Sequence, residues 1–340
     1  MMREGEISDL VALCERIRAR VTKQVFVVED KSIASSLAAG ICAFDVRLAD
    51  AAAMINAAER ACSQARHATQ QKIVVYKQKP AEKTALADSE IADALRASLR
   101  ENTLQLLYQP IVSLKGLHEP QYQVLLRLQT PSGQIIPAAR AIPIAEKENL
   151  VADIDKWVVS RALSVLDQRT KGGEPVRLFV NQSGATLKDL TRPAWLRQLL
   201  MARRVSPQGL VLEIKLPDVM LNLRPAVAFG LALRQLGVKL CLGGFDGSQL
   251  GFQLLSHLPV DYLKVSERFT GPKAHTPPLE AEFKQLIAIG HKLGKRVIAP
   301  HIEDASSAAK LWSSGADYVQ GNFLQQPGRE LGFDFTGAAF

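Results

Sequence analysis

Polar side chains recur where predicted strands end in the second part of the chain, and these residues are the best placed to do chemistry. Asn181 and Glu213 each lie at the end of an apolar strand pattern, and Lys264 and Gln320 lie at the ends of two later ones. Mg²⁺ or Mn²⁺ prefers several oxygen ligands, mostly anionic. Only Glu213 among these four is a carboxylate, and the Lys264 ammonium would compete with a metal for it. We therefore expect no metal at these strand ends.

The elements that position these residues alternate between strands and helices. The predicted strands cover 104–114, 122–128, 176–181, 210–214, 238–242, 262–265, 296–300 and 318–320, and the predicted helices cover 154–168, 195–204, 225–236, 249–257, 280–293 and 305–313. A short loop joins the first two strands, which predicts an antiparallel hairpin. This pattern predicts an α/β fold, a (β/α)8 TIM-like barrel with an antiparallel first strand. A doubly wound open sheet is the alternative that periodicity leaves open.

The first part of the chain reads as a small, incomplete α/β segment. A helix is predicted over 10–21, strands over 25–28, 33–44 and 72–76, and an alanine-rich helix over 50–67. A proline- and lysine-containing stretch and a helix capped by Asp88 or Ser89 then follow. The predicted division is 1–78 for this segment, 79–103 for a linker and connecting helix, and 104–336 for the barrel.

Composition narrows the class of protein. The 340 residues are 47% hydrophobic and 22% charged, with a net charge of +8. A positive balance favours anionic partners, but these charges are scattered and only 6% of residues are aromatic, so nucleic acid is not expected. No apolar run suits a membrane span and no signal peptide is evident, so membrane insertion is not expected. Four widely spaced cysteines indicate the reducing cytoplasm.

An ordered series of motifs resembles the EAL domain family, whose members hydrolyse cyclic di-GMP. The motifs are YQPIV at 108–112, VLLR at 124–127, IPIAE at 142–146, IDKWV at 154–158, FVNQS at 179–183, LEI at 212–214, LKV at 263–265, VIA at 297–299 and QG at 320–321. Each motif is weak by itself, but they follow the family's order and spacing from residue 104 to 335. The resemblance implies the EAL-type barrel.

The departures from the family pattern point away from hydrolysis. Where the family carries acidic residues, this chain holds Gln123, Gly243, Gly244, Ser266 and Pro300. Two-metal phosphodiester hydrolysis needs enough carboxylates to hold both ions. We therefore expect a domain that is not an enzyme and that binds cyclic di-GMP without cleaving it. The alternatives are a phosphodiesterase with a rearranged metal site and an interaction scaffold that binds no ligand.

The resemblance implies a set of ligand-binding residues at the barrel mouth. The set is Gln109, Leu125, Arg127, Asp155, Asn181, Glu213, Pro300, His301, Glu303 and Gln320. Arg127 has the planar cationic fork that suits a phosphodiester. Gln109 and Asp155 match the polar edge of guanine, Leu125 can pack against a base or sugar, and His301 can stack on guanine.

Five of these residues also have a structural interpretation. Arg127 could form a surface ion pair, and Asp155 could favour the dipole at the start of its helix. Glu213 could pair with Lys264, an arrangement we expect more than catalysis. Asn181 could satisfy backbone groups at its strand end, and His301 could be an ordinary half-buried histidine.

The first part of the chain is similar to the second half of a GGDEF domain, although the Gly-Gly-Asp-Glu-Phe signature is absent. A degenerate GGDEF-like segment before a degenerate EAL domain resembles the FimX type of regulator, as do VLLRL at 124–128, APHIE at 299–303 and FDF at 333–335. That resemblance implies a bacterial cyclic di-GMP receptor that recruits a PilZ-domain adaptor. It further implies a role in type IV pilus assembly and twitching motility, in the cytoplasm or at the cell pole.

Overall fold

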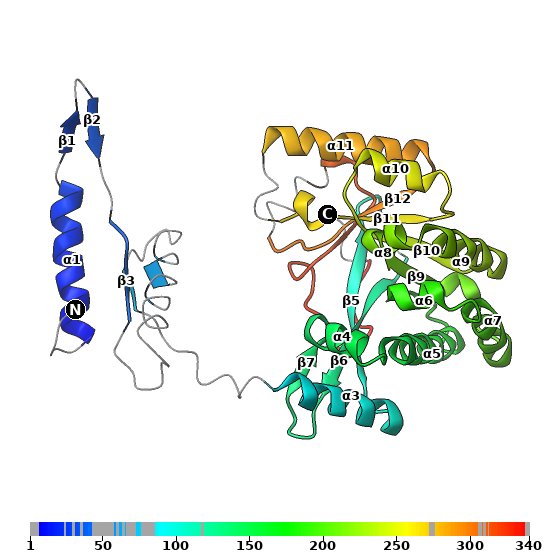
Figure 1. The fold of residues 1–340 in the computed structure, drawn as a ribbon. Helices are drawn as coiled ribbons and strands as arrows, with labels where there is room; N and C mark the ends of the chain where they lie inside the picture. Colours follow the sequence, from blue (N-terminus) through cyan, green and yellow to red (C-terminus); the bar gives the residue numbers. More distant parts are fainter. Residues whose placement is uncertain are drawn as a thin grey trace. The chain divides into compact units, whose positions relative to one another are not determined.

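The computed structural model describes residues 7–23, 25–28, 31–34, 37–42, 58, 61–62, 65, 73–75, 86–116, 119–271, 276–304, 308, 311 and 313–336. Contacts between Cα atoms divide the chain into two compact units, Met1–Ala85 and Leu86–Phe340. Helix α3 (Asp88–Glu101), assigned from the sequence to the connector, lies in the second unit and contacts α4 and β6 (Figure 1). Ala87, rather than Asp88 or Ser89, is its N-cap, and the backbone N–H of Ala87 donates to Glu90 Oε2 at 2.8 Å.

The first unit contains one long helix and two small strand pairs among its described residues. They are α1 (Ile7–Lys23), β1 (Val25–Val28), β2 (Lys31–Ala34), β3 (Ala39–Ile41) and β4 (Ile73–Val75). β1 and β2 pair antiparallel, whereas β3 and β4 pair parallel and both contact α1. Most of the helix predicted over 50–67 lies outside the described residues. Within that range the structure describes residues 58, 61, 62 and 65, and all four are helical.

Eight strands of the second unit close into a barrel. They are β5 (Gln105–Ser113), β6 (Gln121–Gln129), β8 (Arg177–Asn181), β9 (Leu210–Lys215), β10 (Lys239–Phe245), β11 (Tyr262–Val265), β12 (Arg296–Ala299) and β13 (Tyr318–Gln320). β5 pairs antiparallel with both β6 and β13, and the other neighbours are parallel. This closure confirms the TIM-like barrel with its antiparallel first strand and rules out the open sheet. The short strand β7 (Ile135–Pro137) extends the sheet outside the barrel, on β6.

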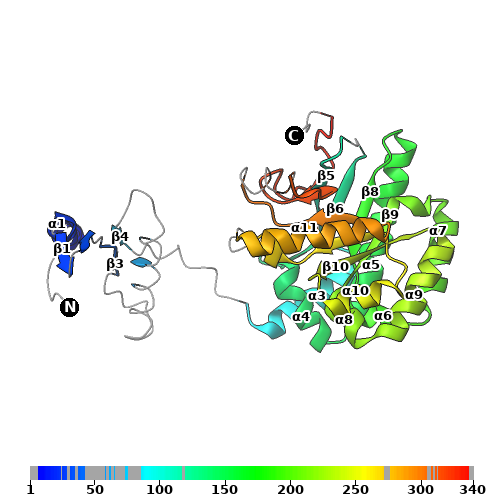
Figure 2. The same cartoon turned by 90° about the horizontal axis from the view of Figure 1, so that it is seen from above.

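Helices cover the outside of the barrel (Figure 2). After α3 they are α4 (Ala138–Lys147), α5 (Val151–Lys171), α6 (Gly184–Lys188), α7 (Arg192–Arg203), α8 (Leu216–Leu221), α9 (Leu223–Leu236), α10 (Gln249–Leu255) and α11 (Pro277–Lys292), with 3-10 turns at Pro207–Gly209 and Glu267–Phe269. The helix predicted over 305–313 falls largely outside the described residues. Within the described part of the chain, no helix combines the length and apolar content needed to cross a membrane.

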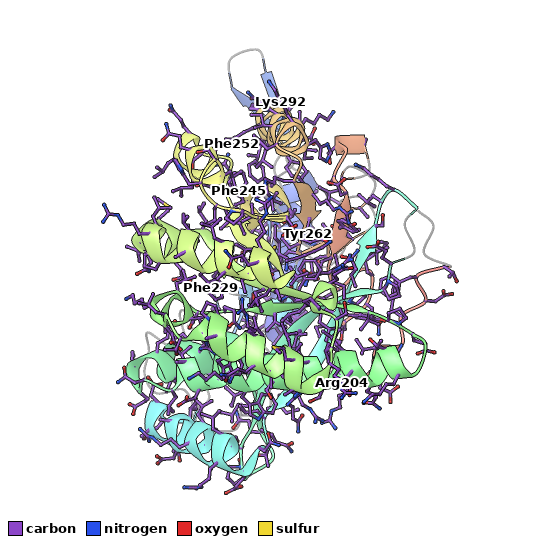
Figure 3. All side chains as sticks on the ribbon, turned by 90° about the vertical axis from the view of Figure 1, so that its right-hand side faces the viewer. Arg204, Phe229, Phe245, Phe252, Tyr262 and Lys292 are labelled. Atoms are coloured by element: carbon purple, nitrogen blue, oxygen red, sulfur yellow. The ribbon has the colours of Figure 1, made fainter. Side chains whose placement is uncertain are left out.

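Alternation along the strands separates an inner from an outer core. Successive strand residues point to opposite faces, so every second residue faces the barrel axis. The inner cluster consists of Ile111, Phe179, Val211, Cys241, Tyr262, Ile298 and Tyr318, and the intervening residues pack beneath the helices. Figure 3 labels Tyr262 among the strands and Phe245 and Phe252 nearer the helical layer, where their rings meet edge to face. The inner cluster fills the middle of the barrel and leaves polar residues at its two ends.

Asp317 supports the strand pair β12–β13 with three hydrogen bonds. Its carboxylate accepts from the backbone N–H of Val297 at 2.7 Å, from His291 Nε2 at 2.8 Å and from the Lys115 ammonium. Burial raises the pKa of Asp317, but the three donors outweigh it and hold the pKa below its ordinary value. The ionised carboxylate therefore stabilises the fold above about pH 4, and this contribution is lost as the pH falls through the folded-state pKa.

We expect Asp317→Asn to lower the free energy of unfolding by about 2 kcal/mol near pH 7, because it weakens charge-assisted hydrogen bonds. The difference from wild type should shrink below about pH 4. Urea unfolding at several pH values measures this, with Asp153→Asn at an exposed position of α5 as the control. A difference that does not change with pH would contradict the assignment.

Candidate functional site

Polar residues converge at the carboxyl ends of the parallel strands. We call Gln109, Gln123, Asn181, Glu213, Lys264 and Gln320 the carboxyl-end ring. Strand register places Gln109 opposite Gln123 and Asn181 opposite Glu213. Five of the six are buried, and Asn181 is exposed. The ring lies where barrel proteins place their active or binding sites.

An ion pair occupies the centre of one half of the ring. Lys264 Nζ donates to Glu213 Oε2 at 2.6 Å and also to Gln123 Oε1, and the Lys264 and Glu213 side chains are each 8% exposed. A Cβ atom on Gly243 would lie 2.5 Å from Glu213 Oε1, so the missing side chain makes room for the Glu213 carboxylate. The pairing expected from the sequence is present.

Amide groups connect the other half of the ring. Gln320 Nε2 donates to Gln109 Oε1 at 2.8 Å, and Gln109 Nε2 donates to Asn322 Oδ1 at 3.2 Å. Asn322 Nδ2 in turn donates to both carboxylate oxygens of Glu303 at 3.1 and 3.2 Å. Gly321 permits this arrangement, because a Cβ there would lie 2.1 Å from the carbonyl oxygen of Ile302. Gln109, Gln320 and Glu303 therefore form one network.

The hairpin of β5 and β6 extends beyond the ring and presents a half-buried face. Gln105, Leu107, Leu125 and Arg127 share this face, which we call the hairpin face, with Gln105 opposite Arg127 in register. Arg127 Nη1 donates to the carbonyl oxygen of Leu126 at 2.9 Å. No carboxylate among the described residues forms an ion pair with Arg127, and burial lowers the pKa of its guanidinium. The surface ion pair considered for Arg127 is thus not found among those residues.

Asp155 binds the start of the neighbouring helix α6. Its Oδ2 accepts from the Ser183 backbone N–H at 2.9 Å, the Ser183 hydroxyl at 2.6 Å and the Thr186 hydroxyl at 2.7 Å. Burial, its largest influence, raises the Asp155 pKa, and these hydrogen bonds oppose the shift. Asp155 is 5% exposed, and its hydrogen bonds to Ser183 and Thr186 hold the segment that follows Asn181. Its predicted contact with guanine stays a prediction.

Pro300 and His301 follow β12 at the same mouth. Pro300 is buried, whereas His301 is exposed and has a φ of 62°, in the left-handed region. The backbone therefore turns sharply at His301 and leaves its imidazole accessible. This exposure is compatible with stacking on a base, which stays a prediction.

The carboxyl-end ring itself offers a single carboxylate to a divalent cation. Glu213 is the one carboxylate of the carboxyl-end ring, and the Lys264 ammonium already lies against it. Among the described residues, no group of three or more His, Cys, Asp or Glu side chains is arranged to hold a metal ion. A cation at Glu213 would have to displace Lys264 Nζ.

Two residues near the predicted site are not in the set predicted from the sequence. Asn322 joins Gln109 to Glu303, and Arg329 Nη2 donates to Gln105 Oε1 at 3.3 Å beside Arg127 on the hairpin face. Both lie in the irregular segment after β13, where no periodicity indicates orientation. The QGN sequence at 320–322 was the available signal for Asn322, because it places a second amide directly after a strand end.

The fold and its polar mouth define a TIM-like barrel with a ligand site at the strand ends. The chain belongs to the EAL domain family, whose model matches residues 92–327. It is similar to the FimX EAL domain of Pseudomonas aeruginosa bound to cyclic di-GMP, with 33% identity and a TM-score of 0.68 over 72% of this chain and 99% of that one. It is also similar to the Xanthomonas citri FimX EAL domain in complex with cyclic di-GMP, with 29% identity and a TM-score of 0.69 over 73% and 97%.

Several curated relatives of greater length carry enzyme names. The cyclic di-GMP phosphodiesterase PdeB of Shewanella oneidensis is 26% identical over 93% of this chain and 37% of its own length. Three further relatives are also named cyclic di-GMP phosphodiesterases. The chain spans less than half the length of the curated relatives it matches.

These relatives contradict the prediction that the chain is not an enzyme. That prediction counted carboxylates only at positions aligned with the family's motifs. Such a count misses acidic groups at neighbouring positions, such as Asp246, which follows Gly243 and Gly244 at the end of β10 and accepts from the Ser248 backbone N–H at 3.0 Å. Counting aligned acids was therefore too narrow a basis for excluding an activity.

Proposed function

We propose that the carboxyl-end mouth of the barrel binds cyclic di-GMP. The carrying observation is the half-buried guanidinium of Arg127, which has no ion-pair partner among the described residues. A guanidinium removed from water gains most from an anion that accepts two parallel hydrogen bonds, as a phosphodiester does. The similarity to FimX EAL domains bound to cyclic di-GMP supports the choice of ligand.

In this proposal the hairpin face and the carboxyl-end ring recognise different parts of the ligand. Arg127 binds the phosphodiester, with Arg329 adding positive charge beside it. Leu125, Pro300 and His301 contact the bases or sugars, and the amides of Gln109 and Gln320 complete the polar wall. The same mouth is lined or supported by Glu303, Asn181, Glu213 and Asp155.

Binding should not need a divalent cation, because Lys264 already neutralises Glu213. We expect calorimetric titration of the full chain with cyclic di-GMP to give the same affinity in EDTA and in Mg²⁺. A loss of affinity in EDTA would contradict metal-free binding. The absence of any saturable heat under both conditions would contradict the ligand itself.

Hydrolysis of cyclic di-GMP is the second candidate function, favoured by the names of the curated relatives. Incubation of the full chain with cyclic di-GMP, with and without Mn²⁺, should then release the linear dinucleotide. Glu213→Gln should abolish its release, because it removes the carboxylate of the carboxyl-end ring. Release that persists in Glu213→Gln would place the reaction elsewhere.

We further propose a FimX-type role for the whole protein. In this role the ligand-bound barrel recruits a PilZ-domain adaptor and regulates type IV pilus assembly and twitching motility, and the first unit is a reduced GGDEF-like domain. The similarity to two FimX EAL domains supports this proposal. Co-purification with a PilZ-domain protein should depend on added cyclic di-GMP, and capture that ignores the ligand would contradict recruitment by the complex.

A further inference from the structure

The opposite, amino-terminal mouth of the barrel concentrates basic residues. Strands β8, β10 and β12 begin with Arg177, Lys239 and Arg296, and β11 begins with Tyr262. On their strands, Arg177, Lys239 and Arg296 lie two residues before Phe179, Cys241 and Ile298 of the inner cluster. Tyr262 belongs to that cluster itself. Because strand side chains alternate, all four face the barrel axis. Three cationic side chains therefore converge around one tyrosine. Arg177 is paired with Glu119 at 2.6 Å, so the unbalanced charge rests on Lys239 and Arg296.

A cavity of about 650 Å³ opens at this mouth. Its charged or phenolic lining residues are Arg234, Lys239, Asp261, Tyr262, Lys295 and Arg296. Four of these are cationic and one is anionic. The volume falls within the range of small-molecule sites. The lining is thus suited to an anion.

The positive charge in this cavity is only partly neutralised. Lys295 Nζ donates to the carbonyl oxygen of Val260 at 2.8 Å, and the Asp261 carboxylate accepts from the Leu240 backbone N–H at 3.0 Å. Arg296 Nη1 donates to the Tyr318 hydroxyl at 3.0 Å.

Lys239 is the clearest example of a positive charge that no described carboxylate balances in this cavity. Its Nζ lies 5.7 Å from the centre of the Tyr262 ring and forms no ion pair with a carboxylate of the described residues. Burial first, and then Arg177 and Arg296, lower the pKa of Lys239, and the opposing effects of Asp261 and Glu119 are smaller.

Tyr262 gives an independent indication of a ligand. Its side chain is fully buried, it lines the cavity, and its hydroxyl has no hydrogen-bond partner among the described residues. A buried hydroxyl without a partner is costly, so such groups in folded proteins usually have one. Burial raises the pKa of Tyr262 to about 12, so the hydroxyl stays a donor at neutral pH.

We propose that the amino-terminal mouth of the barrel is a second binding site, which takes a phosphate group through Lys239, Arg296 and the Tyr262 hydroxyl. The ligand is either free inorganic phosphate or a small phosphomonoester. The site is separate from the carboxyl-end mouth, because its residues begin the strands whose other ends carry the carboxyl-end ring. It does not depend on the function proposed for that mouth.

Titration of the full chain with inorganic phosphate at constant ionic strength, followed by phosphorus NMR and thermal melting, tests this site. We expect saturable binding that Lys239→Gln and Arg296→Gln each weaken at least about tenfold, the effect of losing one charge-assisted hydrogen bond. Tyr262→Phe keeps the ring and should weaken binding about threefold or more. Lys284→Gln, at an exposed position of α11, is the matched control and should bind like wild type.

Two further measurements locate the bound phosphate and identify its chemical form. Arg127→Ala should bind phosphate like wild type, and loss of binding in that variant would assign the phosphate to the carboxyl-end mouth and overturn the proposal. Tighter binding of adenosine monophosphate than of phosphate would identify a phosphomonoester, and the reverse would identify the free ion. Absence of saturable phosphate binding, or equal binding by folded Lys239→Gln and Arg296→Gln, would also overturn the proposal.

Discussion

Arg127→Ala is expected to weaken cyclic di-GMP binding by about thirty- to a hundredfold. The guanidinium is half-buried on the hairpin face, and no carboxylate of the described residues competes for it. Loss of hydrogen bonds from a charged group costs about 2 to 3 kcal/mol, and every 1.4 kcal/mol is roughly a tenfold change in affinity. Calorimetric titration of wild type and variant measures the difference.

The geometry of the guanidinium has its own test in Arg127→Lys. Lysine keeps the charge but loses the planar fork, so it should recover only part of the affinity. Arg197→Ala, at an exposed position of α7, is the matched control and should bind like wild type. Unchanged affinity in Arg127→Ala would show that the ligand does not contact the hairpin face as proposed.

Lys264→Met is expected to lower the free energy of unfolding of the barrel by about 3 to 5 kcal/mol. It leaves the Glu213 carboxylate buried without its cationic partner and removes a donor from Gln123. Trp157 and Trp195 lie in α5 and α7 of the barrel, and the sequence has no tryptophan before residue 157, so tryptophan fluorescence follows the unfolding of the barrel in urea.

The double variant Lys264→Met with Glu213→Gln distinguishes charge from packing. It removes both charges, so it should regain much of the lost stability. Glu213→Gln alone retains the Lys264 ammonium and should destabilise less than Lys264→Met, because the longer lysine side chain can move its charge toward water. A double variant no more stable than Lys264→Met would show that the ammonium acts through packing rather than through Glu213.

The functional predictions differ in how far the sequence could support them. Arg127 was identified from its motif, and the hairpin register places it on a face shared with Leu125. Asp155 was identified in the same way, but its carboxylate binds Ser183 and Thr186, which lie far along the chain and meet it only through packing of α5 against α6. Asn322 and Arg329 lie in an irregular segment, and only their hydrogen bonds in the folded structure show that they belong to the site.

The sequence by itself determined the order of the eight barrel strands, the antiparallel first hairpin and the family, because periodicity and local motifs are properties of neighbouring residues. It did not predict α4, α6, α8 or β7. Only the tertiary structure decided which polar side chains at the strand ends form hydrogen bonds with one another. The Lys264 bond to Gln123 spans most of the barrel sequence, and the basic cluster around Tyr262 draws on four separate strands. Such contacts depend on barrel closure and strand stagger, which place distant residues at one level and which no local pattern encodes.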